Sequence, residues 1–95
     1  MVNWKRIKLV YGQNTIWHIA EHRVDISEVH NVLARRFIIQ RIIVNGVLRY
    51  SVLGESYGRI LTLILEPVGG DDMLLITAYD SPESRKRIYR QWIKR

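Results

Sequence analysis

The feature that most limits how this chain can fold is the dipeptide Asn45-Gly46, which lies between two runs of β-branched residues. Asn-Gly favours a two-residue turn with positive φ angles, the commonest connection in a tight β-hairpin. Phe37–Val44 precedes the turn. Its length also fits a buried helix, but its isoleucine content favours a strand. Val47–Leu53 follows as the return strand, so these segments predict an antiparallel hairpin.

The remaining strands are predicted from short apolar runs separated by Gly, Pro and Asp. They are a first short strand over Ile7–Tyr11 that ends at Gly12, a strand over Arg59–Glu66 after a turn through Gly54–Gly58, and a strand over Met73–Tyr79 after Pro67 and the loop Val68–Asp72.

Two helices are predicted before the hairpin. Asn14 fits the N-cap of a helix that runs to Arg23. Asp25 and Glu28 form a capping box at the start of a second helix. At helical spacing, the apolar faces consist of Ile16, Ile19 and Ala20 in the first helix and Ile26, Val29, Val32 and Leu33 in the second.

Ser81–Glu83 predicts the start of a third helix, with a serine cap, proline at the first helical position and an acid in the first turn. Its apolar arc contains Ile88, Tyr89, Trp92 and Ile93. Arg85 falls inside this arc, where a charge is costly unless it is paired or lies at an open cleft. We therefore expect Arg85 to be a site residue. The alternative is that its stem covers Trp92 while the guanidinium reaches water.

These elements predict one α+β domain over the 95 residues. We expect a small antiparallel sheet of three to four strands, with two N-terminal helices and one C-terminal helix packed on it and no three-layer arrangement. The chain has no cysteine, which excludes disulfides and thiolate metal sites and fits a reducing cytosol. Neither a signal peptide nor a membrane-spanning run is recognised, so we expect a cytoplasmic protein without a membrane partner.

The chain is basic, with 15 Lys and Arg against nine Asp and Glu, which gives a net charge of +6. Such a balance favours nucleic acid, an anionic membrane surface or an acidic protein as partner, with simple solubility as the alternative. On the third helix, a basic stripe of Lys86, Arg90 and Lys94 lies with Arg87 beside it. We expect these four residues to contact RNA phosphates or an acidic protein partner.

Several segments of the chain resemble BrnT-type bacterial toxins, which are small ribonucleases. The similar segments are His18–Val24, Glu28-Val29, Val32-Leu33, Leu48–Gly54, Gly58–Leu61, Leu75–Ala78 and Arg87–Tyr89. The resemblance implies a RelE-like fold, RNA cleavage and neutralisation by a small DNA-binding antitoxin of the ribbon-helix-helix type. Three positions depart from the family pattern: Arg23 replaces Gly, Tyr79 replaces Arg, and Arg85 replaces Glu.

RNA cleavage without a metal needs a base, an acid and cations that stabilise the charged phosphorane. The candidate catalytic residues are His22, Arg49, Tyr79 and Arg85. Each also has a structural alternative: His22 bonding a neighbouring backbone group, Arg49 as a solvated strand residue, and Tyr79 as a core residue with a solvated hydroxyl.

His18, Glu21 and His22 match the H-x-x-E-H spacing of a zinc peptidase. A catalytic zinc needs a third protein ligand, and no later segment supplies a convincing one. We therefore expect no metal site and no other cofactor, and we interpret the histidines as two surface residues. The three tryptophans are expected in the core, although Trp17 lies off the apolar face of its helix and is also a candidate interface anchor.

Two functions follow from the sequence. The first is a ribonuclease toxin, which Arg49 and the basic final helix support. The second is a non-catalytic module that keeps the toxin fold and binds nucleic acid or protein through a degenerate site, which Tyr79 in place of Arg supports. A metal-dependent hydrolase at His18, Glu21 and His22 is a third hypothesis, and metal analysis of the purified protein tests it.

Overall fold

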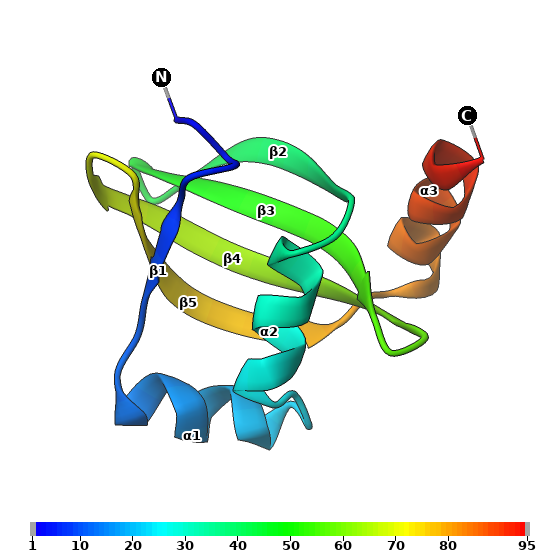
Figure 1. The fold of residues 1–95 in the computed structure, drawn as a ribbon, viewed down its shortest axis with the longest axis horizontal. Coiled ribbons are helices and arrows are strands. Elements are labelled where there is room, and N and C mark those ends of the chain that lie inside the picture. Colours follow the sequence, from blue (N-terminus) through cyan, green and yellow to red (C-terminus); the bar gives the residue numbers. More distant parts are fainter. Residues whose placement is uncertain (1, 95) are drawn as a thin grey trace.

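The structure is a computed structural model that describes residues 2–94, and its helices lie on both faces of one sheet (Figure 1). Their order is β1 (Lys8–Val10), α1 (Gln13–Glu21), α2 (Ile26–Leu33), β2 (Phe37–Val44), β3 (Val47–Ser56), β4 (Arg59–Gly69), β5 (Asp72–Asp80) and α3 (Glu83–Ile93). The α+β class and the three helices are confirmed.

The sheet has five strands in the spatial order β1-β5-β4-β3-β2. The expectation of three to four antiparallel strands is therefore wrong. Strands β2 to β5 form an antiparallel meander, but β1 adds to β5 in parallel, with Lys8 opposite Asp72 and Val10 opposite Leu74. A strand of three residues is too short to show a two-residue alternation, so the sequence gives no sign of its direction or partner.

The first two of the three tight turns in the meander have the geometry that Asn-Gly favours. Asn45 and Gly46 have φ angles of 51° and 79°, which confirms the predicted hairpin. The second turn is Tyr57-Gly58, with φ angles of 48° and 84°. The turn predicted to begin at Gly54 is wrong, because β3 continues to Ser56.

Gly54 is a strand residue that allows helix α2 to approach the sheet closely. A Cβ atom at this position would lie 2.7 Å from Cγ1 of Val32. The glycine therefore serves helix packing and not a turn. The predicted break at Pro67 is also wrong: β4 runs through Pro67 to Gly69, and the register shifts there as expected for proline at a bulge.

The capping box of α2 is confirmed. The backbone N–H of Asp25 donates to Oε1 of Glu28 at 3.1 Å, and the N–H of Ser27 donates to Oδ2 of Asp25 at 3.1 Å. The hydroxyl of Ser27 also donates to the same carboxylate. The bonds from the Ser27 side chain and backbone hold the pKa of Asp25 below its usual value.

The other two helix starts differ from the prediction. Helix α1 begins after Gly12 and not after Asn14, and the N–H of Gly12 donates to Oγ1 of Thr15 at 3.3 Å. Helix α3 has Pro82 as its N-cap, because Ser81 is buried and its Oγ lies 2.7 Å from Oγ1 of Thr62. The buried hydroxyl of Ser81 therefore finds its partner in the sheet and not in the helix.

Arg23 connects α1 and α2 with a φ angle of 60°, in the left-handed region that favours glycine. Its carbonyl accepts a hydrogen bond of 2.9 Å from Nη1 of Arg59, and the same nitrogen lies 3.1 Å from Oε2 of Glu28. Glycine would adopt this backbone angle without strain, whereas arginine adopts it at a cost.

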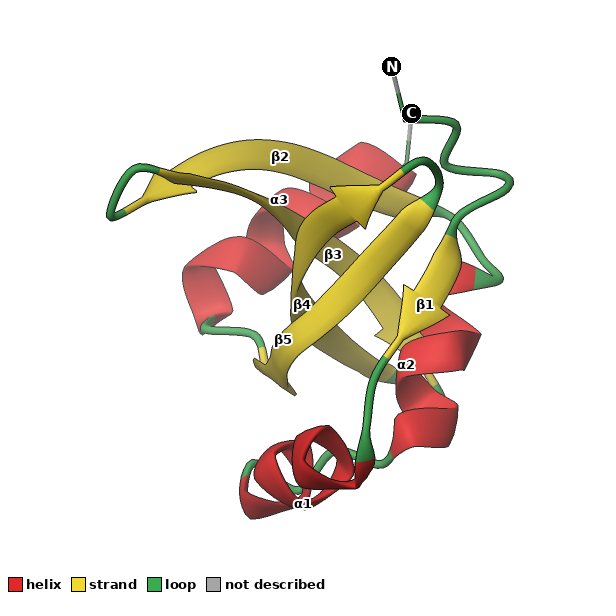
Figure 2. Ribbon diagram, turned by 90° about the vertical axis from the view of Figure 1, so that its left-hand side faces the viewer, coloured by secondary structure: helices red, strands yellow, loops and turns green. Residues whose placement is uncertain are grey.

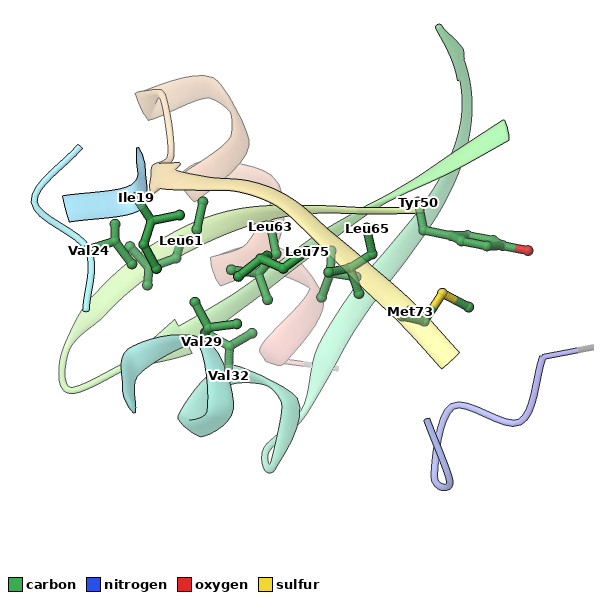
Figure 3. Packing of buried hydrophobic residues seen from close by; sticks show 12 residues of the cluster. Ile19, Val24, Val29, Val32, Tyr50, Leu61, Leu63, Leu65, Met73 and Leu75 are labelled. Atoms are coloured by element: carbon green, nitrogen blue, oxygen red, sulfur yellow. The ribbon is translucent and has the colours of Figure 1, made fainter. Parts of the chain in front are cut away.

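One face of the sheet, here the α1–α2 face, carries the main core (Figure 3). Alternate residues of the strands meet the inner sides of both N-terminal helices. The buried residues of this core are Ile19, Val24, Val29, Val32, Tyr50, Val52, Leu61, Leu63, Leu65, Met73, Leu75 and Ala78. The predicted apolar face of α2 is confirmed, whereas Ala20 of α1 is exposed.

The opposite face, here the α3 face, has a smaller core under the C-terminal helix. Leu53, Ile60 and Tyr89 are buried, with Ile38, Trp92 and Ile93 packed against them. Helix α3 lies on the opposite side of the sheet from α1 and α2, so the molecule has three layers (Figure 2). The expectation that there would be no three-layer arrangement is therefore wrong. The helical wheel is also wrong about Ile88, which is 55% exposed.

The tryptophans divide between core and surface. Trp4 is half-buried and packs edge-on against Tyr50, with ring centroids 5.0 Å apart. Trp92 is half-buried, with the guanidinium of Arg36 4.8 Å from its ring centroid. Trp17 is 61% exposed, so its assignment to the core is wrong.

Candidate functional site

The α3 face is apolar under the helix and polar beyond it. Arg49 and Ser51 lie on this face of β3, because they alternate with the core residues Tyr50 and Val52. Tyr79 of β5 pairs with Thr62 of β4 and shares its face. The sheet therefore brings Arg49, Ser51 and Tyr79 onto one surface, beside the first turns of α3.

Arg85 reaches from α3 to the sheet, as its place in the apolar arc predicted. Its Nη2 donates to Oγ of Ser51 at 3.0 Å, and Ser51 is only 4% exposed. The Nε of Arg85 is buried and has no hydrogen-bond partner among residues 2–94. The side chain therefore holds a cation on the polar part of the α3 face.

The acidic neighbours of Arg85 are engaged elsewhere. Oδ2 of Asp80 lies 3.0 Å from Nζ of Lys86, and Oε1 of Glu83 lies 2.9 Å from Nη1 of Arg90. Within the part of the chain that the structure describes, no carboxylate forms an ion pair with Arg85. A guanidinium held in this way offers a site for an external anion.

Arg49 lies two residues from Ser51 on the same face, but its charge is partly offset. Its Nε is 3.2 Å from Oε1 of Glu66 on β4, and the two side chains are 27% and 26% exposed. Arg49 therefore shares the surface with Arg85 but is less available to an anion.

His22 and Tyr79 lie next to each other at the margin of the sheet. Helix α1 packs against β5, and β1 pairs only with the first part of β5, Asp72–Leu74. The ring centroids of His22 and Tyr79 are 6.3 Å apart. Imidazole and phenol are both side-chain groups of the kind that can act as general acid or base.

His18 anchors this margin. Its Nε2 lies 3.0 Å from Oγ1 of Thr77, and its ring centroid is 5.3 Å from that of His22, with the ring planes nearly perpendicular. Among residues 2–94, no group of three or more His, Cys, Asp or Glu side chains is placed to hold a metal ion.

The basic stripe of α3 is divided by ion pairs. Lys86 and Arg90 contact Asp80 and Glu83, as described above. Arg87 and Lys94 are exposed, and neither forms an ion pair with another of the described residues. Of the four residues predicted to bind phosphate, two therefore have their charge offset by an acidic side chain of the described chain and two do not.

The predicted site residues thus form two groups. Arg85 and Arg49 lie around Ser51, and His22 lies beside Tyr79. Sequence reasoning missed Ser51, although the two-residue alternation of β3 puts it on the same face as Arg49. It also missed the contact of His18 with Thr77, which joins residues 59 positions apart and leaves no local pattern.

In the described part of the chain, no helix is both long enough and apolar enough to cross a bilayer.

The comparisons with known proteins bear on the fold. No protein-family model matches the sequence, and no curated protein matches it. Among solved structures, the chain is similar to the crystal structure of the ribonuclease toxin BrnT from Brucella abortus. The TM-score is 0.58 at 20% identity, and the match covers 82% of this chain and 100% of that one. The chain therefore has a BrnT-like fold, and the predicted resemblance is confirmed at that level.

Proposed function

We propose that this BrnT-like domain is the ribonuclease toxin of a type II toxin–antitoxin pair. In this proposal the chain cleaves RNA without a metal or cofactor in the cytoplasm, and a DNA-binding antitoxin of the ribbon-helix-helix type holds it inactive. Two findings support the proposal: the similarity to a solved ribonuclease toxin, and the polar surface on the α3 face.

The observation that carries the proposal is the position of Arg85. A half-buried guanidinium with no carboxylate partner among residues 2–94 is unfavourable unless something else compensates it. A phosphate group supplies the missing charge and accepts the bidentate hydrogen bonds that arginine donates. Ser51 fixes one nitrogen of the group and so orients the rest of it.

The cleavage step needs only proton transfers and charge stabilisation. The 2′-oxygen of the RNA attacks the neighbouring phosphorus, and the bond from phosphorus to the 5′-oxygen of the next nucleotide breaks. A base removes the 2′-proton, and an acid supplies a proton to the leaving oxygen. We assign these proton transfers to His22 and Tyr79, and stabilisation of the charged phosphorane to Arg85 with Arg49.

The C-terminal helix is proposed to hold the rest of the RNA strand. Lys86, Arg87, Arg90 and Lys94 are all on α3 or at its end, next to Arg85. Arg87 and Lys94 are expected to contribute most, because Lys86 and Arg90 already have acidic partners.

Analysis of the product ends tests this function. The purified chain is incubated with a panel of end-labelled RNAs in the presence of EDTA. We expect cleavage products with 2′,3′-cyclic phosphate and 5′-hydroxyl ends. Cleavage that requires an added metal, or products with 5′-phosphate ends, would contradict the mechanism.

A second function, the non-catalytic module, is supported by two observations. Glu66 offsets the charge of Arg49, and Tyr79 stands where the family pattern has Arg. In that case the chain would bind the same RNAs with similar salt dependence, but leave every one of them intact. The product analysis therefore separates the two functions when it is combined with a binding measurement.

A further inference from the structure

One edge of the sheet is unpaired over its whole length. Strand β2 is the last strand in the order β1-β5-β4-β3-β2, and it pairs with β3 through all eight residues from Phe37 to Val44. No other strand of residues 2–94 pairs with its outer side. An edge of this length and isoleucine content is a template for another strand. The opposite edge, β1, has only three residues.

A hollow opens beside this edge on the α1–α2 face. It has a volume of about 630 Å³ and is lined by Val2, Trp4, Ile39, Arg41 and Tyr50. Ile39 and Arg41 belong to β2 itself, so the hollow borders the unpaired edge. Figure 3 shows Tyr50 at the end of the core farthest from Ile19 and Val24. The walls are mostly aromatic and aliphatic, with one cation.

The charge around β2 is positive. Arg41 is exposed and forms no ion pair with any described residue, and Arg35 and Arg36, also exposed, directly precede the strand. Two copies paired along the whole of β2 in antiparallel fashion would bring the two Arg41 side chains close together near the centre of the pairing, with a net charge of +6 on each chain. The charges therefore favour an acidic partner over a second copy.

We propose that the outer edge of β2 binds an extended acidic segment of a protein partner by β-strand addition. The backbone of the segment pairs with Phe37–Val44, an apolar side chain of the segment enters the hollow, and a carboxylate faces Arg41. Main-chain hydrogen bonds and a pocket for alternate side chains are the two parts that this mode of recognition requires. The inference does not depend on the proposed ribonuclease function, because neither the hollow nor strand β2 contains a residue that is assigned to RNA cleavage or RNA binding.

Synthetic peptides test the proposal on the full chain. The panel consists of eight-residue peptides in which one Glu and one apolar residue (Ala, Val, Leu or Trp) stand two positions apart, because Ile39 and Arg41 lie on the same face of β2. Each peptide has two controls that are N-methylated at every second residue in either register. Amide hydrogen exchange and chemical shifts of the ¹⁵N-labelled protein report binding. We expect protection along β2, lost in one of the two methylated registers, and affinity about tenfold higher for Leu than for Ala.

Charge reversal at the two edges gives a matched pair of variants. Arg41→Glu is expected to weaken peptide binding about fivefold, because it replaces an attraction with a repulsion at an exposed site. Lys8→Glu makes the same change on β1 at the opposite edge and is expected to leave binding unchanged. Equal effects of the two variants would show that only net charge matters and would overturn the proposal.

Two further results would overturn it. The first is the absence of protection at β2 with every peptide of the panel. The second is self-association of the unliganded chain in sedimentation equilibrium with protection of the same amides, which would assign the edge to a second copy.

Discussion

The two faces of the sheet differ in how apolar they are. The α1–α2 face buries a continuous set of aliphatic residues under two helices, whereas the α3 face is apolar only under one helix and carries Arg49, Ser51 and Tyr79 beyond it. Successive residues of a strand point to opposite faces, so neighbours such as Leu63 and Ile64 belong to different environments. One face can therefore supply the stability that lets the other keep polar groups.

The polar groups on the α3 face have an energetic cost. Thr62, Ser51 and Ser81 are buried, and Nε of Arg85 has no internal acceptor among the described residues. Burial of an unsatisfied polar atom costs about 1–3 kcal/mol. Such costs are common at functional sites, although Oδ1 of Asn31 in α2 and Oγ of Ser56 in β3 are also buried without a partner among the described residues. The comparison therefore makes separate predictions for the two faces.

The largest expected difference is between Leu63→Ala and Ile64→Ala. Leu63 is fully buried on the α1–α2 face, so its truncation leaves a cavity and is expected to lower the free energy of unfolding by about 2–5 kcal/mol. Ile64 is half-exposed on the other face, and we expect a loss of about 1 kcal/mol. Urea unfolding of both variants measures the difference. Equal losses would show that the α3 face contributes as much to stability as its opposite.

The next prediction concerns activity. Arg85→Leu is expected to lower RNA cleavage at least about 100-fold, because a cation that stabilises the phosphorane is lost. The melting temperature is expected to change little, because the substitution removes the buried Nε without a partner but also leaves the buried Oγ of Ser51 without its donor. Arg6→Leu, at an exposed position, is the matched control. Full activity of the Arg85→Leu variant would leave Arg85 with a purely structural role.

The sequence predicts local features of this fold more fully than its layers. The Asn45-Gly46 turn, the Asp25 capping box and the inward direction of Arg85 depend on residues close together in the chain, and all three are confirmed. The pairing of β1 with β5 joins segments more than 60 positions apart and leaves no periodic signal. The side of the sheet that α3 occupies is likewise set by tertiary packing.

For the candidate site too, the sequence predicts individual residues better than their arrangement in space. Arg49, Tyr79, His22 and Arg85 were identified one at a time from residue type and resemblance, and the sheet brings them together as two groups. The ion pair of Arg49 with Glu66 was not predicted, because it depends on the register of β3 against β4. Catalytic roles for these residues stay predictions until the variants are measured.

Salt dependence separates the paired from the unpaired residues of α3. If RNA phosphates contact this helix, the logarithm of the binding constant falls linearly with the logarithm of the salt concentration, with a slope of about −0.7 per contact for a single strand. Arg87→Gln and Lys94→Gln are each expected to reduce the slope by about that amount. Lys86→Gln and Arg90→Gln are expected to reduce it less, because Asp80 and Glu83 already neutralise these side chains. Four equal reductions would mean that the internal ion pairs open on binding.

The smallest expected effect is a pH dependence confined to the α1–α2 face. Hydrogen bonds from Ser27 lower the pKa of Asp25, so the folded state favours its charged form. The stabilisation is therefore present above the ordinary value of about 3.9 and is lost as the pH falls through the lower value in the folded chain. Asp25→Asn keeps the cap without the charge. We expect wild type to be more stable than this variant at pH 6, and the difference to vanish at pH 2, in parallel urea titrations. The N-cap of helix α3 is Pro82, whose side chain accepts no hydrogen bond, so the amide exchange of α3 should not follow this titration. A stability difference that persists at pH 2 would show that the charge of Asp25 is not what stabilises α2.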